Sequence, residues 1–289
     1  MPELKHTFKT DILFKLLFTK HPDLLKHLIA QLLKLQYNKI SKFEIRNPEM
    51  PPDSIGNKFC RLDILMTVNN QQVNLEVQVE NEKAYPERSL FNWARAYSNA
   101  LPAGDNYSLL PRTVLINIID FTLFKDSKEF HSEFQPLEVT RKSPLTDKMV
   151  LHYFELKKLP NKLSKDDMLH LWLMLFKANT EEELRNIDRL GVPEMSEAIT
   201  AYNNVTTSAE FREIERLRIK ASHDEAQALY NAELKGERKG KRKGKREGEL
   251  KTKQEIAKTL VSLGDPIDKI ITATGLTKEE IEGLTDTHQ

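Results

Sequence analysis

The sequence contains a single cysteine, Cys60, among its 289 residues. One cysteine excludes an intramolecular disulfide, which is typical of a reducing compartment, so we expect a cytoplasmic location. Cys60 lies among alternating apolar residues, where a buried and inert thiol is favoured over a nucleophile.

Long hydrophobic runs are also absent. The most apolar window, LHLWLMLF at 169–176, is far shorter than the roughly 20 residues that a membrane-spanning helix needs. The N-terminal sequence MPELKHTFKTD has no uninterrupted apolar segment, so we expect no signal peptide. The sequence therefore predicts a protein that does not use a membrane as its partner.

The net charge is small, at +1, but it is unevenly distributed. Residues 235–253 hold ten Lys or Arg and three Glu, a net +7, which leaves −6 for the rest of the chain. A polyanion would therefore be bound by a local patch rather than by a general field. No P-loop, dinucleotide-binding glycine motif, zinc cluster or Ser-His-Asp arrangement in the sequence argues for another enzyme class.

One strongly patterned stretch, residues 59–80, stands out from this background. Apolar residues alternate with polar ones on both sides of Asn69-Asn70. Because Asn tolerates positive φ, we predict a β-hairpin closed by a type I′ turn. Paired residues then have numbers that sum to 139, which sets Asp63 directly opposite Glu76.

This register places two carboxylates side by side on one face of the hairpin. Like charges at such positions destabilise a sheet, and a cation shared by Asp63 and Glu76 would remove the repulsion. Mg²⁺ favours one or two carboxylates together with water and substrate phosphate. The alternative is an ordinary solvated face that carries the two acids by chance.

The remaining elements are predicted from periodicity and from capping residues. We expect an α/β fold, with a mixed sheet flanked by helices on both faces, followed by a helical C-terminal extension. Further strands are predicted near 40–45, 112–121 and 150–156, and helices near 11–20, 22–35 and from Pro86. From Ser164, the predicted N-cap of the next helix, only helices are expected, and Thr180 with Glu183 forms a capping box.

Four parts are predicted along the chain. They are an α/β core at 1–160, a helical extension at 161–234, a basic glycine-repeat linker or arm at 235–253 and a small helical tail module at 254–289. In the third part, glycine recurs at every fourth position from Gly236 to Gly248, and each costs about 1 kcal/mol in a helix. The repeat is open to three interpretations: a solvated linker, a close helix contact or a phosphate-binding arm.

Several motifs in a fixed order resemble one family. The first is D-x-x-F-K-x-x-F, with Asp11, Lys15 and two phenylalanines, and the second is D-x(12)-E-x-Q, with Asp63, Glu76 and Gln78. The later matches are RSLFNWARAYS with Arg88, LPAGDNYSLLP, VLINIIDFTLF and LTDKMVLHYFELKKL. Over roughly residues 8–160 the chain resembles the PD-(D/E)XK nuclease family of transposases, the YhgA-like, recombination-promoting nucleases.

The resemblance implies a restriction-endonuclease-like fold and a Mg²⁺-dependent DNA endonuclease that is associated with recombination and mobile elements, with Mn²⁺ as a second suitable ion. It implies that Asp63, Glu76 and the carbonyl of Val77 bind the metal. Asp11 would be an auxiliary acidic residue near the metal. The alternative is that Asp11 only stabilises the start of its helix.

The other implied site residues are catalytic or contact substrate. Gln78 stands where most of these enzymes have Lys, and its neutral amide can orient water but cannot act as a base. Lys15, Lys58, Arg61 and Arg88 are the expected contacts to DNA. Two alternatives remain, a DNA-binding protein of the same fold with little or no cleavage, and a helical interaction protein. The long charged helix expected at 208–234 offers a surface through which a homo-oligomer could form.

Overall fold

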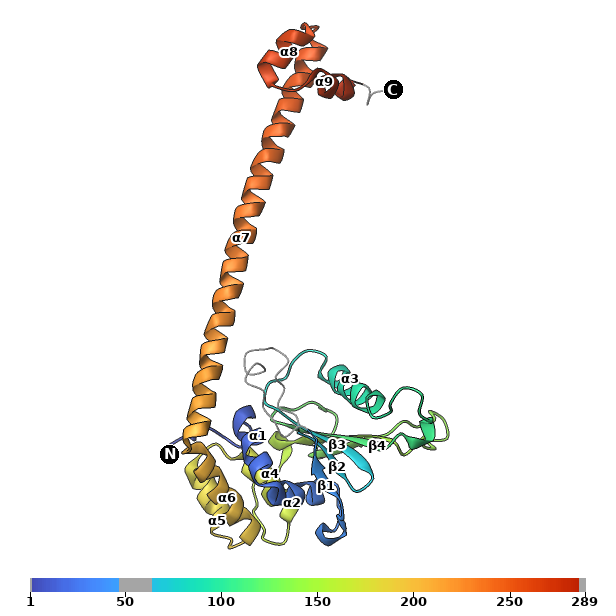
Figure 1. Cartoon of the computed structure of the whole chain (residues 1–289), viewed down its shortest axis with the longest axis vertical. Coiled ribbons are helices and arrows are strands. Elements are labelled where there is room, and N and C mark those ends of the chain that lie inside the picture. Colours follow the sequence, from blue (N-terminus) through green and yellow to red (C-terminus); the bar gives the residue numbers. More distant parts are fainter. Residues whose placement is uncertain (1, 47–63, 286–289) are drawn as a thin grey trace. The chain divides into compact units, whose positions relative to one another are not determined.

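The computed structural model describes residues 2–46 and 64–285 (Figure 1). The chain divides into two compact units, Met1–Ala221 and Ser222–Gln289, which are described separately. The first unit is built on a six-stranded mixed sheet with helices on both faces, as the sequence predicts. Whether the four predicted parts are separate domains stays a prediction.

The sheet has the strand order β1-β2-β3-β4-β6-β5. Its centre is parallel, because β3 pairs with β4 and β4 pairs with β6 in the same direction. The edges are antiparallel. The strand bounds are β1 Phe43–Ile45, β2 Ile64–Val68, β3 Gln71–Gln78, β4 Arg112–Ile119, β5 His131–Phe134 and β6 Met149–Glu155.

The predicted hairpin is present, in the predicted register. Ile64 pairs with Leu75 and Met66 pairs with Val73, so the numbers sum to 139. The turn type was wrong, because a type I′ turn needs positive φ at both central residues and among the two asparagines only Asn69 has it, at 52°. The side chain of Asn69 accepts a hydrogen bond from the backbone N–H of Ser41 at 2.9 Å, which ties this turn to the segment before β1.

Helices cover the two faces of the sheet unequally (Figure 1). One face is packed by α1 (Asp11–Lys20), α2 (Pro22–Leu32) and α4 (Met168–Lys177). Of the helices in the described residues, α3 (Tyr85–Ser98) is the one that covers the other face. The main core includes an aromatic cluster in which Phe18 lies against Trp172 and Phe176 at centroid distances of 6.3 and 6.1 Å.

Two helix starts in the first unit can be compared with the prediction. Helix α4 begins at Met168 rather than near Ser164, because Asp167 is the N-cap and accepts from the N–H of His170 at 2.9 Å. The capping box of Thr180 and Glu183 is confirmed at the start of α5. The remaining elements are α5 Glu181–Asp188, α6 Pro193–Thr206, and the 3₁₀ turns η1 Tyr37–Lys39, η3 Tyr107–Leu109 and η4 Leu156–Lys158.

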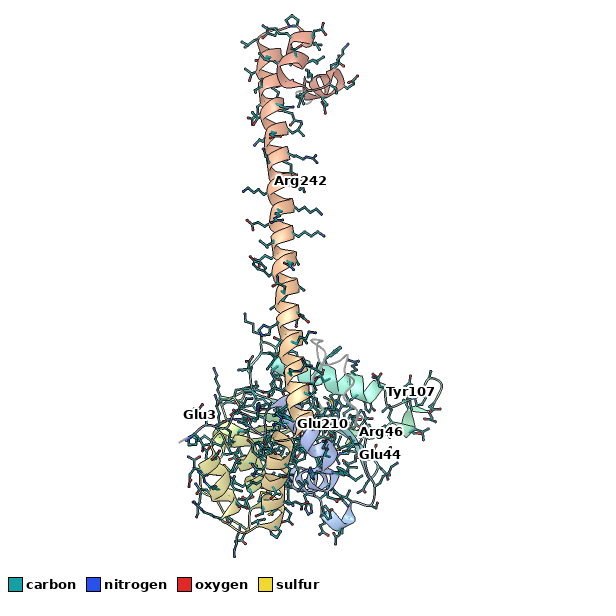
Figure 2. The ribbon with its side chains drawn as sticks, turned by 60° about the vertical axis from the view of Figure 1, so that its left-hand side comes forward. Glu3, Glu44, Arg46, Tyr107, Glu210 and Arg242 are labelled. Atoms are coloured by element: carbon teal, nitrogen blue, oxygen red, sulfur yellow. The ribbon has the colours of Figure 1, made fainter. Side chains whose placement is uncertain are left out.

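The second unit is helical. Helix α7 (Ala209–Ser262) begins in the first unit and continues through the glycine repeat, and Arg242 projects from its surface (Figure 2). It is followed by α8 (Ile267–Thr274) and α9 (Lys278–Thr285), which pack on its end through Ala257, Ile270 and Ile281. Among the described residues, no helix is long and apolar enough to cross a membrane.

Candidate active site

Strand β3 directs Glu76 toward α3. Side chains alternate along a strand, so Leu75 enters the main core while Glu76 lies on the opposite face. The Glu76 side chain is buried, with 3% of the residue exposed. Its Oε1 accepts hydrogen bonds from Asn92 Nδ2 at 2.9 Å and from Asn74 Nδ2 at 3.3 Å. These two amides fix the orientation of the carboxylate.

Helix α3 faces Glu76 with a polar stripe. Tyr85, Arg88, Ser89 and Asn92 recur at the spacing of one helical face. The Tyr85 hydroxyl donates to Asn117 Oδ1 at 3.0 Å. Burial, and next the negative charge of Glu76, raise the pKa of Tyr85, so this phenol stays a neutral donor at any physiological pH. The layer between β3, β4 and α3 is therefore polar and ordered.

Gln78 and Arg88 lie together at the end of β3. Gln78 Oε1 accepts from Arg88 Nη2 at 2.8 Å, and Gln78 Nε2 donates to the carbonyl of Glu80 at 2.9 Å. Arg88 also forms an ion pair with Glu82 through Nη1, and its guanidinium lies 4.8 Å from the centroid of the Tyr85 ring. The structure thus brings together two of the residues that the sequence singles out.

Asp11 lies near the same end of the sheet. It lines a hollow of about 410 Å³ together with Val79, which follows Gln78 by one residue. Its Oδ2 accepts from Arg218 Nη2 at 2.9 Å. In the same hollow, Lys9 Nζ pairs with Asp120 Oδ2 at 2.7 Å, and the backbone N–H of Asp120 donates to the carbonyl of Gln78.

The other predicted site residues divide into two groups. Lys15 is buried on α1, with 6% exposed, and Val77 lies on β3 beside Glu76. Asp63, Lys58 and Arg61 lie outside the described residues. The proposed functions of all five residues therefore stay predictions.

Sequence reasoning missed several residues around Glu76 and Gln78. The sequence signal for Asn92 was a polar stripe at helical spacing, which a search for apolar periodicity passes over. The signal for Asp120 was its position directly after a buried strand: β3 and β4 are parallel, so their carboxyl ends meet at one edge. Lys9 gave no signal, because its partners Asp120 and Asn179 are distant in sequence.

The described residues suit a hard divalent cation. Glu76 offers carboxylate oxygen, and Asn74 Oδ1 beside it is buried without a hydrogen-bond partner among the described residues. Mg²⁺ takes such oxygen ligands. An acceptor oxygen that no donor satisfies, next to a buried carboxylate, fits a cation better than it fits an apolar core.

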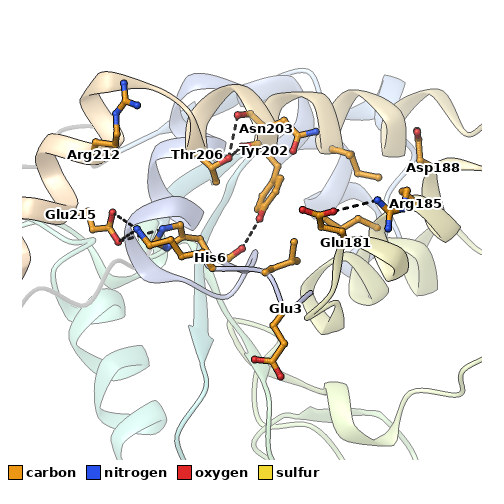
Figure 3. A pocket seen from close by; sticks show the side chains of 14 residues that line it. Glu3, His6, Glu181, Arg185, Asp188, Tyr202, Asn203, Thr206, Arg212 and Glu215 are labelled. Carbon is orange, nitrogen blue, oxygen red and sulfur yellow. Dashed lines mark hydrogen bonds and ion pairs between the residues drawn. The ribbon is translucent and has the colours of Figure 1, made fainter. Parts of the chain in front are cut away.

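A second hollow, of about 700 Å³, lies between the N-terminal segment, α5, α6 and the start of α7 (Figure 3). Its polar groups are largely paired with one another. Tyr202 donates to the carbonyl of His6 at 2.6 Å, and Glu215 lies 3.3 Å from His6 Nε2. Burial lowers the pKa of His6. None of the predicted site residues lines this hollow, so we do not assign the active site to it.

The sequence of the chain matches a known protein family. The sequence model of the PD-(D/E)XK nuclease family transposases matches residues 8–232. The chain belongs to this family, which confirms the resemblance and indicates a nuclease-type function. No curated protein and no solved structure matches the chain.

Proposed function

We propose that the protein is a Mg²⁺-dependent DNA endonuclease of the recombination-promoting type. The observation that carries this proposal is the buried carboxylate of Glu76, which two amides orient on the strand that also carries Gln78. Carboxylate oxygens that neighbouring amides hold in place are ligands that Mg²⁺ favours. In a family of nucleases, we take metal binding as its function.

In this proposal Glu76, Asp63 and the carbonyl of Val77 hold the ion. The β2–β3 register, carried one pair beyond Ile64 and Leu75, motivates the choice of Asp63. A bound Mg²⁺ would lower the pKa of a water molecule and offset charge on the scissile phosphate. Mn²⁺ suits the same oxygen donors.

The side chains around the ion have separate functions in this proposal. Asn74 and Asn92 hold the carboxylate in place, and Gln78 orients the attacking water through its amide. Arg88, Lys58 and Arg61 provide positive charge toward the DNA, and Lys15, which is 6% exposed, adds its charge from within the fold. Asp11 is an auxiliary acidic residue whose charge Arg218 balances.

A second candidate function is DNA binding with little or no cleavage. Gln78 replaces the usual Lys, and the guanidinium of Arg88 is already paired with Glu82. Both observations reduce the positive charge that remains to stabilise a transition state. Homo-oligomerisation and a cytoplasmic location stay predictions from the sequence.

Removal of metal is the direct test of cleavage. We expect the purified protein to convert supercoiled plasmid to nicked or linear forms in the presence of Mg²⁺. Cleavage should stop when EDTA is added. Asp63→Asn should lose cleavage as EDTA does, because it removes one ligand charge. Binding in a gel-shift assay without cleavage would favour the second function. If the protein neither binds nor cleaves DNA, the helical interaction protein is the alternative that remains.

The basic stretch of α7 allows a test of DNA binding that is independent of cleavage. We expect neutralisation of five exposed residues to make the salt dependence of DNA affinity shallower, by about 0.9 in log–log slope for each phosphate that the variant no longer neutralises. The five substitutions to Gln are at Lys239, Lys241, Arg242, Lys243 and Lys245.

A matched control changes the same amount of charge in the first unit. The five exposed positions are Lys125, Lys128, Arg141, Lys157 and Lys162. An equal change of slope in the two variants would mean that only total charge matters. It would remove the case for a DNA-binding arm in α7.

A further inference from the structure

The edge of the sheet that lies away from Glu76 carries a cluster of metal-binding side chains. His131 and Glu133 on β5, and His152 on β6, each offer one ligand atom, and these atoms lie within 4.8 Å of one another. Glu133 is the direct cross-strand neighbour of His152. The cluster lines a cavity of about 130 Å³ next to the end of α2 and the three residues that follow it, 33–35.

We propose that His131, Glu133 and His152 form a binding site for a zinc-like transition-metal ion, separate from the nuclease site. His131 Nε2 and His152 Nδ1 are 3.0 Å apart. Two nitrogens bound to one tetrahedral Zn²⁺ are about 3.4 Å apart, because each bond is about 2.0–2.1 Å long. The two histidines therefore need to move by only a few tenths of an ångström.

Glu133 completes the site with a small rotation. Two ligands of one ion can be no more than about 4.2 Å apart, and the cluster atoms lie within 4.8 Å of one another, so any separation above that limit must shorten on binding. Glu133 is exposed, and its Oε1 accepts a hydrogen bond from Gln135 at 2.8 Å. An exposed carboxylate can rotate toward the histidines at little cost, whereas His152 is fixed in the sheet with 6% exposed.

The ligand set selects the kind of ion. Imidazole nitrogens suit zinc, copper, nickel and iron, while Mg²⁺ prefers oxygen. An imidazole with the ordinary pKa of about 6.5 is mostly neutral at pH 7, so both rings can act as metal ligands. Two histidines and one carboxylate leave a position open for water or an anion.

Two positively charged side chains at the cavity affect which ligand can take that open position. Arg112 and Lys34 line the same cavity. Arg112 Nε is buried and has no hydrogen-bond partner within the part of the chain that the structure describes. The two cations lower the affinity for a metal, and they favour an anionic fourth ligand once it is bound. Lys34→Gln should therefore tighten Zn²⁺ binding, by about threefold.

The site is on the opposite side of the sheet from the nuclease residues. His152 pairs with Ile116, which lies in the main core with Leu75. Glu76 is in register with Asn117, on the α3 face. A mutation at one site should therefore remove metal from that site without affecting metal binding at the other. A bound ion would link β5, the edge strand, to β6.

The test measures bound zinc rather than cleavage. Untagged full-length protein is incubated with Zn²⁺, passed through gel filtration and assayed for metal content. We expect about one zinc per chain in the wild type and in Glu76→Gln. His131→Gln and His152→Gln should lose it, and Glu133→Gln should bind at least about tenfold more weakly, since even outer-shell changes cost about that much.

The matched control is His223→Gln, which changes an exposed histidine on α7. It should retain zinc as the wild type does. His152→Gln risks misfolding because His152 is buried, so the decision rests on His131→Gln, whose fold is checked by circular dichroism. Zinc retained by His131→Gln at the wild-type level, or no zinc in the wild type, would overturn the proposed site. The contact between His131 and His152 would then be only a hydrogen bond.

Discussion

Glu76→Gln should abolish Mg²⁺-dependent cleavage of plasmid DNA while the protein stays folded. Gln has the same shape and still accepts hydrogen bonds from Asn92 and Asn74, so the packing beneath α3 is preserved. The substitution removes the negative charge that is proposed to bind the metal. Loss of several kcal/mol of transition-state stabilisation corresponds to a fall in rate of roughly 1,000-fold or more.

The measurement is the initial rate of plasmid nicking under saturating Mg²⁺. Asn92→Ala should fall between the wild type and Glu76→Gln, at about 10–100-fold below the wild type, because it removes a group that only orients the ligand. The control Glu80→Gln makes the same chemical change at an exposed position after β3, and its rate should stay within a factor of about three. A wild-type rate in Glu76→Gln would place the chemistry elsewhere.

Glu155→Ala should destabilise the first unit by about 3–5 kcal/mol, the usual cost of removing one partner of a buried ion pair. Glu155 is 1% exposed, and its Oε2 pairs with Lys158 Nζ at 2.5 Å. Its Oε1 also accepts from the backbone N–H groups of Leu123 and Phe124, at 2.7 and 3.3 Å. Alanine leaves both backbone donors without this acceptor, and it removes the negative charge beside Lys158, whose Nζ keeps only its hydrogen bond to the carbonyl of Phe124 among the described contacts.

Urea unfolding followed by tryptophan fluorescence measures this effect. Both tryptophans of the chain, Trp93 and Trp172, lie in the first unit on opposite faces of the sheet, so the signal reports that unit. Glu129→Ala, an exposed site just before β5, is the control and should change stability by no more than about 0.5 kcal/mol. Equal urea midpoints for the two variants would show that the Glu155 network makes no net contribution to the free energy of unfolding.

The sequence was most informative where one periodicity dominated. Alternation on both sides of Asn69-Asn70 predicted β2, β3 and their register, because a slip of one residue would expose Met66 and Val73. The buried strand β4 followed from its apolar run. Strand β5 was not predicted, since four residues of mixed polarity, HSEF, give no clear period.

The candidate site was predictable only in part. Glu76, Gln78 and Arg88 were found because the family motifs lie in local sequence. Asn92 and Asn117 escaped notice, because their functions depend on which face of α3 meets the sheet. Leu90 shows the difficulty: its side chain belongs to an apolar motif, yet the residue is 47% exposed. Tertiary packing, rather than local pattern, decides which stripe of such a helix is buried.

The aromatic cluster of Phe14, Phe18, Trp172 and Phe176 has a consequence for synthesis of the protein on the ribosome. Its two halves are about 150 positions apart, so the apolar positions of α1 and α2 that face α4 stay uncovered until α4 has emerged, even after the strands have been made. Contacts of such long sequence separation form slowly and leave nascent chains prone to aggregation. A polypeptide released near residue 160 would lack Trp172 and Phe176, and would depend on chaperones to remain dispersed.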